Sequence, residues 1–220
     1  MQGDTDMIAL NRRSMVLGLA AAALPGWAFA QDATPEVFAQ KLLEAVPPHG
    51  EKVLGSPDAP VVMVEYASAT CPHCAEFHID VLPGLKEKYI DTGKVRLIFR
   101  EFPLDQLALG AFMLARCVPD DRYFPAMDLI FRRQKAWNSK RAKEELFRIV
   151  QMAGLSAEQA EACIKREQLA KDIIATAETA KKEFGVKGTP TFFIDGTFVD
   201  GHKDATEVTA AIEAALAARK

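Results

Sequence analysis

The chain has 220 residues, which is long enough for one domain or for one domain that carries a large insertion. Hydrophobic residues make up 49% and charged residues 26%, the balance of an ordinary globular protein, so a disordered chain is excluded. The net charge of −3 lacks the basic excess that nucleic-acid binding favours, and we expect no nucleic-acid partner.

Residues 1–30 have the features of a secretory signal peptide. Arg12 and Arg13 precede an apolar run over residues 15–24, and residues 28–30, Ala-Phe-Ala, supply the small side chains of a cleavage site. The apolar run is well short of the roughly twenty residues that a membrane span needs. We therefore predict export and cleavage, by either the general or the twin-arginine route.

The periodicity of the remaining chain predicts alternating helices and strands. In chain order the expected elements are a helix over 35–46, a strand over 52–54, a strand over 61–66, a helix from 71 towards 88, a strand over 95–100, helices over 104–184, a hairpin with strands over 191–194 and 197–199, and a helix over 204–218.

A predicted strand and a predicted helix lie on either side of residue 70. Residues 61–66, Val-Val-Met-Val-Glu-Tyr, are almost continuously apolar, which is typical of a central strand covered on both faces, and Glu65 is the exception. Pro72 suits the first position of the following helix, and Pro83 predicts a kink within it.

This order of elements is typical of an α/β protein with a thioredoxin-like fold and an inserted helical subdomain. We predict a signal peptide over 1–30, a thioredoxin-like domain formed by 31–103 and 185–220, and an inserted helical subdomain over 104–184.

The motif Cys71-Pro72-His73-Cys74 carries the predicted chemistry. A cysteine at the start of a helix lies beside free backbone N–H groups and the positive end of the helix dipole, which favour its thiolate. A charged His73 adds to this effect, while Cys74 lies one turn further in. Cys71 is therefore the predicted attacking and leaving sulfur, and Cys74 the resolving one. A stabilised thiolate makes the disulfide form a stronger oxidant, so the expected direction is disulfide donation.

Three other interpretations of these cysteines have less support in the sequence than a redox-active pair. A c-type haem site needs a histidine directly after the second cysteine, where this chain has Ala75. A zinc site formed by Cys71, Cys74 and His78 lacks a fourth ligand. A purely structural disulfide over so short a loop contributes little stabilisation. We expect no cofactor and no metal.

A second element of the site is the sequence Gly188-Thr189-Pro190-Thr191 before the predicted hairpin. A proline that enters a strand is unusual, and with the Cys71 helix upstream we expect the peptide bond before Pro190 to be cis. The main chain of Thr189 then pairs with an extended substrate peptide, a mode of recognition that tolerates many sequences.

Two ionisable residues lie near the motif. Glu65, close to the end of its strand, is a candidate for a partly desolvated acid that exchanges a proton with Cys74; a solvated carboxylate at the strand end is the open alternative. His78, one turn beyond Cys74, is expected to be exposed on the helix.

Cys117 and Cys163 bring the number of cysteines to four, and an even number in an exported protein indicates disulfides. Because Cys71 and Cys74 are the natural couple, the other two are predicted to form a structural bridge.

Together these residues resemble the DsbA family of periplasmic disulfide oxidoreductases. The resemblance covers about residues 50–218 and rests on Glu65-Tyr66 before the site, the Cys-Pro-His-Cys motif, the helical insertion and Thr189-Pro190 before the last hairpin.

The resemblance implies that Cys71 is the nucleophile, that Glu65 is a buried acid and that Pro190 is cis. It also implies a periplasmic location and reoxidation by a quinone-linked membrane protein of the DsbB type. DsbA is the established example of an oxidant made strong by a stabilised thiolate. The chain departs from the best-known oxidases in its second cysteine pair and in Thr189, where they carry valine; threonine is familiar from isomerases and reductases.

The main prediction is therefore an enzyme that donates disulfide bonds to reduced or unfolded exported proteins through the Cys71–Cys74 redox pair. A disulfide reductase or isomerase is the first alternative, and a peptide-binding chaperone with an inert disulfide is the second. Too few residues precede the first strand for the dimerisation domain that an isomerase uses, so we expect a monomer.

Overall fold

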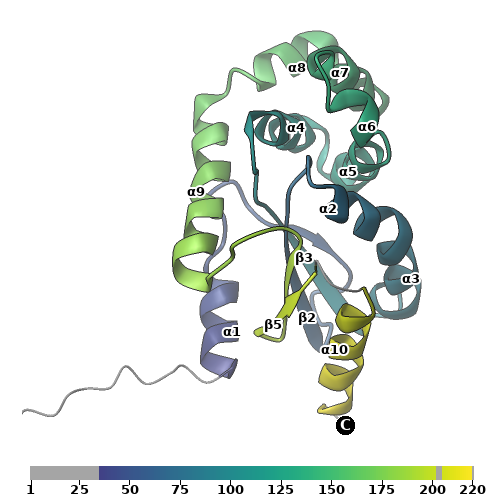
Figure 1. Ribbon diagram of the computed structural model, residues 1–220, viewed down its shortest axis with the longest axis vertical. Helices are drawn as coiled ribbons and strands as arrows, with labels where there is room; N and C mark the ends of the chain where they lie inside the picture. Colours follow the sequence, from purple (N-terminus) through teal and green to yellow (C-terminus); the bar gives the residue numbers. More distant parts are fainter. Residues whose placement is uncertain (1–34, 202–204, 220) are drawn as a thin grey trace, which may run out of the picture. The chain divides into compact units, whose positions relative to one another are not determined.

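The computed structural model describes residues 35–201 and 205–219, which contain a five-stranded mixed sheet in the order β1-β3-β2-β4-β5 (Figure 1). β2 and β3 run parallel, and the other three pairs are antiparallel. The strands are β1 (Lys52–Leu54), β2 (Val61–Ala67), β3 (Val95–Glu101), β4 (Thr191–Ile194) and β5 (Thr197–Asp200). The predicted strands are thus confirmed, three of them longer by one residue. The predicted signal peptide lies outside the described residues.

The helix predicted from residue 71 is present but is divided into four segments. These are α2 (Pro72–Glu76), η1 (Phe77–Val81), α3 (Leu82–Leu85) and η2 (Lys86–Ile90), of which η1 and η2 have wider, π-helical turns. Pro83, in the first turn of α3, has no N–H to donate to the carbonyl four residues earlier. The irregularity predicted at Pro83 therefore takes the form of π turns on either side of it.

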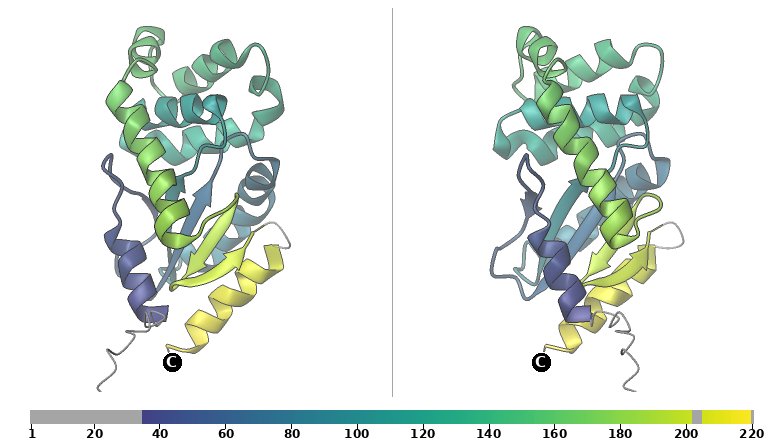
Figure 2. Two further views of the ribbon diagram at one scale, coloured as in Figure 1. Left: turned by 60° about the vertical axis from the view of Figure 1, so that its left-hand side comes forward. Right: turned by 90° about the vertical axis from the view of Figure 1, so that its left-hand side faces the viewer.

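Both faces of the sheet are covered, as the apolar run of β2 predicts. The helices that cover it, besides α2 to η2, are α1 (Pro35–Glu44), α9 (Glu167–Phe184) and α10 (Ala205–Ala217). Successive residues of a strand point to opposite faces. Val61 and Met63 of β2 accordingly pack with η1, α3 and α10, whereas Val64 and Tyr66 pack with α1 and α9. Figure 2 shows α9 and α10 on opposite sides of the strands.

Residues 104–184, here called the helical segment, contain six α-helices and one 3₁₀ turn between β3 and β4, and all of them are described. They are α4 (Gln106–Cys117), η3 (Asp120–Arg122), α5 (Tyr123–Arg132), α6 (Gln134–Trp137), α7 (Ala142–Met152), α8 (Ala157–Cys163) and α9. Figures 1 and 2 show α4 to α8 together at one end of the sheet. The assignment of this segment as an inserted subdomain stays a prediction.

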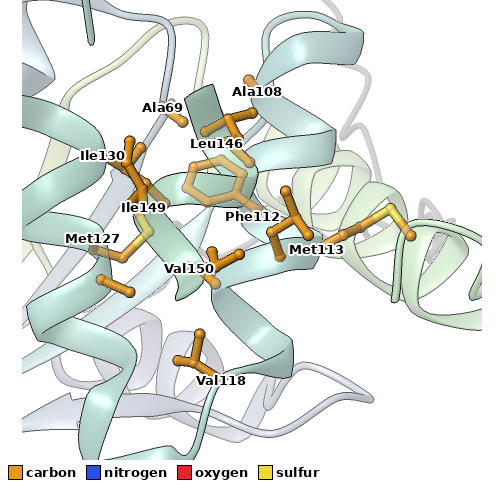
Figure 3. Packing of buried hydrophobic residues seen from close by; sticks show 14 of the residues in the cluster. Ala69, Ala108, Phe112, Met113, Val118, Met127, Ile130, Leu146, Ile149 and Val150 are labelled. Carbon is orange, nitrogen blue, oxygen red and sulfur yellow. The ribbon is translucent and has the colours of Figure 1, made fainter. Parts of the chain in front are cut away.

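The helical segment has its own hydrophobic cluster, which reaches the cysteine motif. Phe112, Ile130 and Val150 lie within it (Figure 3). The same cluster includes Cys71 and Cys74, so the helical segment packs directly against the start of α2. In the described part of the chain, no helix is both long and apolar enough to cross a membrane.

Candidate active site

The cysteine motif lies where β2 ends and α2 begins. Cys71 is the N-cap of α2, with extended backbone angles (φ −75°, ψ 122°), and Pro72 follows at the first helical position. Pro72 fits there because its missing N–H has no helical partner to lose. Cys71 and Cys74 are both buried and are free thiols. The helix start therefore presents two thiols one turn apart.

The surroundings of Cys71 stabilise its thiolate. A hydrogen bond from the Cys74 thiol is the largest influence; against the opposing effect of burial it brings the pKa of Cys71 down to about 5. The Thr189 hydroxyl and the backbone N–H groups of Cys74 and His73 lower this pKa further. Because the pKa lies about two units below neutral pH, Cys71 is a thiolate there and thus a nucleophile and a good leaving group.

Cys74 has the opposite environment. Burial raises its pKa well above the ordinary value, and the neighbouring Cys71 and the charge of Glu65 raise it further. The N–H of Ser68 lies 3.5 Å from its sulfur and acts in the other direction. Cys74 therefore keeps its proton at neutral pH, and the two sulfurs differ strongly although they belong to one motif.

The loop before β4 faces Cys71. The peptide bond between Thr189 and Pro190 is cis, as expected. The sulfur of Cys71 lies 3.1 Å from the carbonyl oxygen of Thr189, to which it donates a hydrogen bond when it is protonated. The Thr189 hydroxyl is buried and has no hydrogen-bond partner within the described residues, which leaves it available to the Cys71 sulfur.

His73 and Pro72 are the exposed members of the motif. The side chain of His73 is about half exposed, and Nδ1 lies 3.2 Å from Glu76 Oε2. Its backbone N–H is among the groups that lower the pKa of Cys71.

Glu65 and His78 form a buried pair beneath the motif. Glu65 has no exposed surface, so the alternative of a solvated carboxylate is wrong. Nε2 of His78 lies 2.9 and 3.1 Å from the two carboxylate oxygens. The expectation of an exposed His78 is also wrong: its ring is stacked on Phe131 of α5, with 4.3 Å between ring centroids. Phe131 belongs to the helical segment, so helical periodicity around His78 gives no sign of this contact.

Gln134 is a residue of the site that the sequence does not reveal. It lies in α6, is buried, and its side-chain amide donates hydrogen bonds of 2.9 Å to the carbonyl oxygens of Ala69 and Cys71. The helical segment thereby holds the loop that carries Cys71. Because 63 residues separate Gln134 from Cys71, no local signal in the sequence indicates the contact.

The second pair of cysteines is bonded. A disulfide joins Cys117 at the end of α4 to Cys163 at the end of α8, with Cα atoms 6.2 Å apart. Within the described residues, no cluster of three or more His, Cys, Asp or Glu side chains is arranged to hold a metal ion.

Known proteins share this fold. The chain matches the family model described as Thioredoxin over residues 49–214. Among solved structures, alpha-DsbA1 of Wolbachia pipientis is 34% identical, with a TM-score of 0.74, over 82% of this chain and 96% of that chain. A protein-disulfide isomerase of Novosphingobium aromaticivorans is 28% identical, with a TM-score of 0.68, over 76% of this chain and 97% of that chain.

Among curated proteins, one from Rickettsia bellii that is provisionally named a protein-disulfide oxidoreductase is 36% identical over 168 residues, which is 76% of this chain. The chain spans 64% of the length of that relative. The family-model match spans the sheet, the cysteine motif and the helical segment, so the chain belongs to the thioredoxin family. The identity with alpha-DsbA1 over most of both chains shows that, within this family, the chain belongs to the DsbA family.

Proposed function

We propose that this chain is a thiol:disulfide oxidoreductase that donates disulfide bonds to exported proteins through Cys71 and Cys74. The observation that carries the proposal is the contrast between the two sulfurs: the pKa of Cys71 is lowered to about 5 and that of Cys74 is raised. A stabilised Cys71 thiolate favours the reduced form of the pair, which makes its disulfide form a strong oxidant.

The reaction follows from this contrast. A substrate thiolate attacks Cys71 Sγ in the Cys71–Cys74 disulfide, and Cys74 leaves with the electron pair and takes up a proton. A second substrate thiolate then attacks the substrate sulfur of the mixed disulfide, and the Cys71 thiolate leaves. Two electrons have passed from the substrate dithiol to the enzyme, and the low pKa of Cys71 favours the second step because a stable thiolate is the better leaving group.

The partners of the reaction belong to the same proposal. Reduced or unfolded exported proteins are the substrates, and the main chain of Thr189 is the proposed contact for an extended substrate segment. A quinone-linked membrane protein of the DsbB type reoxidises the pair, the location is periplasmic, and the enzyme acts as a monomer.

Two observations favour a reductase or isomerase as the second candidate. The Thr189 hydroxyl lowers the pKa of Cys71, and through this effect we expect it to alter both thiolate stability and release of the mixed disulfide. One similar solved structure, from Novosphingobium aromaticivorans, is named a protein-disulfide isomerase.

Equilibration with glutathione separates the two candidates. We expect a reduction potential of the Cys71–Cys74 pair closer to the roughly −120 mV of DsbA than to the roughly −270 mV of thioredoxin, since stabilising the thiolate raises the potential. The measurement quantifies the reduced fraction by mass spectrometry across a series of glutathione ratios. Cys71→Ser is the control that must abolish disulfide transfer to a reduced model protein. A potential near that of thioredoxin assigns the chain to the reductases instead.

A further inference from the structure

We propose that Gln134 of α6 is a positioning residue for the nucleophile: its side-chain amide fixes the loop before α2 and, with it, the orientation of Cys71 at the helix start. The inference rests on the proposed function and adds a residue to it. It starts from two contacts of one group, since the amide nitrogen of Gln134 donates hydrogen bonds to two carbonyl oxygens of the loop that carries the nucleophile.

The loop over residues 68–70, between β2 and α2, takes part of its support from the helical segment. The N–H of Cys71 closes the loop by donating to the carbonyl oxygen of Ser68, at 3.1 Å. Ala69 has no exposed surface, and among the described residues its carbonyl oxygen accepts a hydrogen bond from Gln134 alone. A buried carbonyl without a donor is costly. Removal of the amide therefore leaves this loop conformation without one of its stabilising contacts.

The carbonyl oxygen of Cys71 joins the loop to the helix. It accepts a hydrogen bond of 3.2 Å from the N–H of Ala75 and one of 2.9 Å from the Gln134 amide. A carbonyl oxygen has two lone pairs, so both hydrogen bonds can form together. The amide thus holds the peptide group that connects the nucleophile to α2.

One soft backbone angle decides where the Cys71 side chain lies relative to α2. Each residue has two soft angles, φ and ψ. The ring of Pro72 fixes the φ angle that follows, and the helix fixes the angles after it. The remaining angle is ψ of Cys71, which is extended at 122°. A group that holds the Cys71 carbonyl against α2 fixes this angle, and thereby the direction of the side chain.

The sulfur has contacts on two sides that depend on this angle. On the helix side, the backbone N–H groups of His73 and Cys74 are among the groups that lower the pKa of Cys71. On the other side, the sulfur lies 3.1 Å from the carbonyl oxygen of Thr189. A change in ψ of Cys71 moves the sulfur relative to both, so the amide of Gln134 affects the thiolate without touching it.

A glutamine suits this position because of its chemistry. Its amide is neutral and has two N–H donors on one nitrogen, so it can serve two carbonyl oxygens at once. Lysine and arginine also have several donors, but they would bring a positive charge into a buried space, which is costly without a partner. An ionised glutamate has almost the same shape and can only accept hydrogen bonds.

The packing of the helical segment sets the position of the amide. Trp137 of α6 has no exposed surface, and its indole N–H donates a hydrogen bond of 2.7 Å to the carbonyl oxygen of Ile130 in α5. Ile130 and Ala69 belong to one hydrophobic cluster (Figure 3). The reactivity of Cys71 therefore depends on how the helical segment docks on the loop before α2.

The experiment compares the Cys71 thiolate in the wild type and in two variants. Gln134→Met keeps the length of the side chain and removes both donors. The matched control is Tyr123→Phe, since the buried Tyr123 hydroxyl also connects the helical segment to the sheet, through a hydrogen bond of 2.7 Å to Glu101. Urea denaturation first establishes that each variant is folded. The ultraviolet absorbance of the thiolate then gives the pKa of Cys71, and equilibration with glutathione gives the stability of the disulfide.

We expect Gln134→Met to raise the pKa of Cys71 by about one, roughly the contribution of one hydrogen bond to a charged group. A less stable thiolate disfavours the reduced form, so the glutathione equilibrium should move about tenfold towards the disulfide. Tyr123→Phe should lose stability and keep the wild-type values of both. A pKa of Cys71 that stays the same or falls in Gln134→Met overturns the inference, as does an equal rise in Tyr123→Phe.

The two proposals fail in different ways. The inference concerns the difference between Gln134→Met and the wild type, whereas the proposed function concerns the potential of the wild type itself. A wild-type potential near that of thioredoxin contradicts the proposed function and leaves the comparison between the variants intact.

A measurement on the wild-type protein covers the case in which Gln134→Met does not fold. NMR of nitrogen-labelled protein follows the side-chain amide hydrogens of Gln134, with the exposed Gln151 as the internal reference. We expect the Gln134 hydrogens to exchange with solvent more slowly than those of Gln151, and their resonances to shift as Cys71 titrates. Exchange as fast as that of Gln151, or resonances that do not respond to the titration of Cys71, overturn the inference without any substitution.

Discussion

Glu65 and Glu101 are two carboxylates on neighbouring strands of one sheet, both without exposed surface, and they have opposite surroundings. Glu101 at the end of β3 binds the guanidinium of Arg116 through both oxygens, accepts a hydrogen bond of 2.7 Å from Tyr123, and lies 3.3 Å from Nε2 of His49. Among the described residues, the carboxylate of Glu65 on β2 has a hydrogen bond with His78 alone.

The different partners separate a carboxylate with a structural role, Glu101, from one that is available for proton exchange, Glu65. Burial raises the pKa of Glu101, but the hydrogen bond with His49 and the charge and hydrogen bonds of Arg116 outweigh burial and bring it down to about 2. Arg116 does not lose its proton in a protein, so Glu101 is fixed as an anion at neutral pH. Among the described residues, the side-chain partner of Glu65 is instead an imidazole, which donates a hydrogen bond without carrying a permanent charge. The chemistry of the partners, and not burial, decides which carboxylate can exchange a proton.

The largest effect is expected from Glu101→Gln. The substitution leaves the buried Arg116 guanidinium without its counter-charge, and breaking one side of a buried pair costs about 3–5 kcal/mol. Urea denaturation measures the loss of unfolding free energy, while the ultraviolet absorbance of the Cys71 thiolate should titrate as in the wild type. A loss below about 1 kcal/mol, the usual value for an exposed pair, would show that the network contributes no more than a surface ion pair.

The acid dependence of stability tests the same network in the wild-type protein, without any substitution. The pKa of Glu101 is about 2 in the folded chain, against an ordinary value of 4.5. Below pH 4.5 the unfolded chain therefore binds a proton that the folded chain does not, and stability falls as the pH falls towards 2. The shift corresponds to about 3 kcal/mol lost across this window. Urea midpoints at a series of pH values should show this loss in the wild type and not in Glu101→Gln.

Local patterns in the sequence predict the sheet and the motif well, because the signals are short-range. The apolar run of β2, the helix-start proline after Cys71 and the proline before β4 each depend on a few adjacent residues, and the structure shows each element near its predicted bounds.

The partners of the buried polar groups are not predictable in the same way. His78 occupies a helix position that periodicity leaves exposed, and it is buried where Phe99 of β3 and Phe131 of the helical segment contact its ring. Glu101 directly follows the predicted strand over 95–100 as a charged residue with no sign of burial, and its partners come from three separate parts of the chain. Gln134 is likewise brought to Cys71 by tertiary packing. Such contacts depend on how the helical segment docks, which no local pattern encodes.

The smallest effect on stability is expected from Glu65→Gln, and this variant gives the most direct comparison of Glu65 with Glu101. The amide has the shape of the carboxylate, retains an oxygen that accepts a hydrogen bond from His78, and no longer requires a charge to be buried. We expect a change in unfolding free energy within about 1 kcal/mol, the net value of a typical hydrogen bond. The measurement is urea denaturation of Glu65→Gln and Glu101→Gln under the same conditions, since both variants change one buried carboxylate to an amide. Equal losses of unfolding free energy in the two variants would mean that Glu65 is a structural anion like Glu101, and would contradict a role in proton exchange.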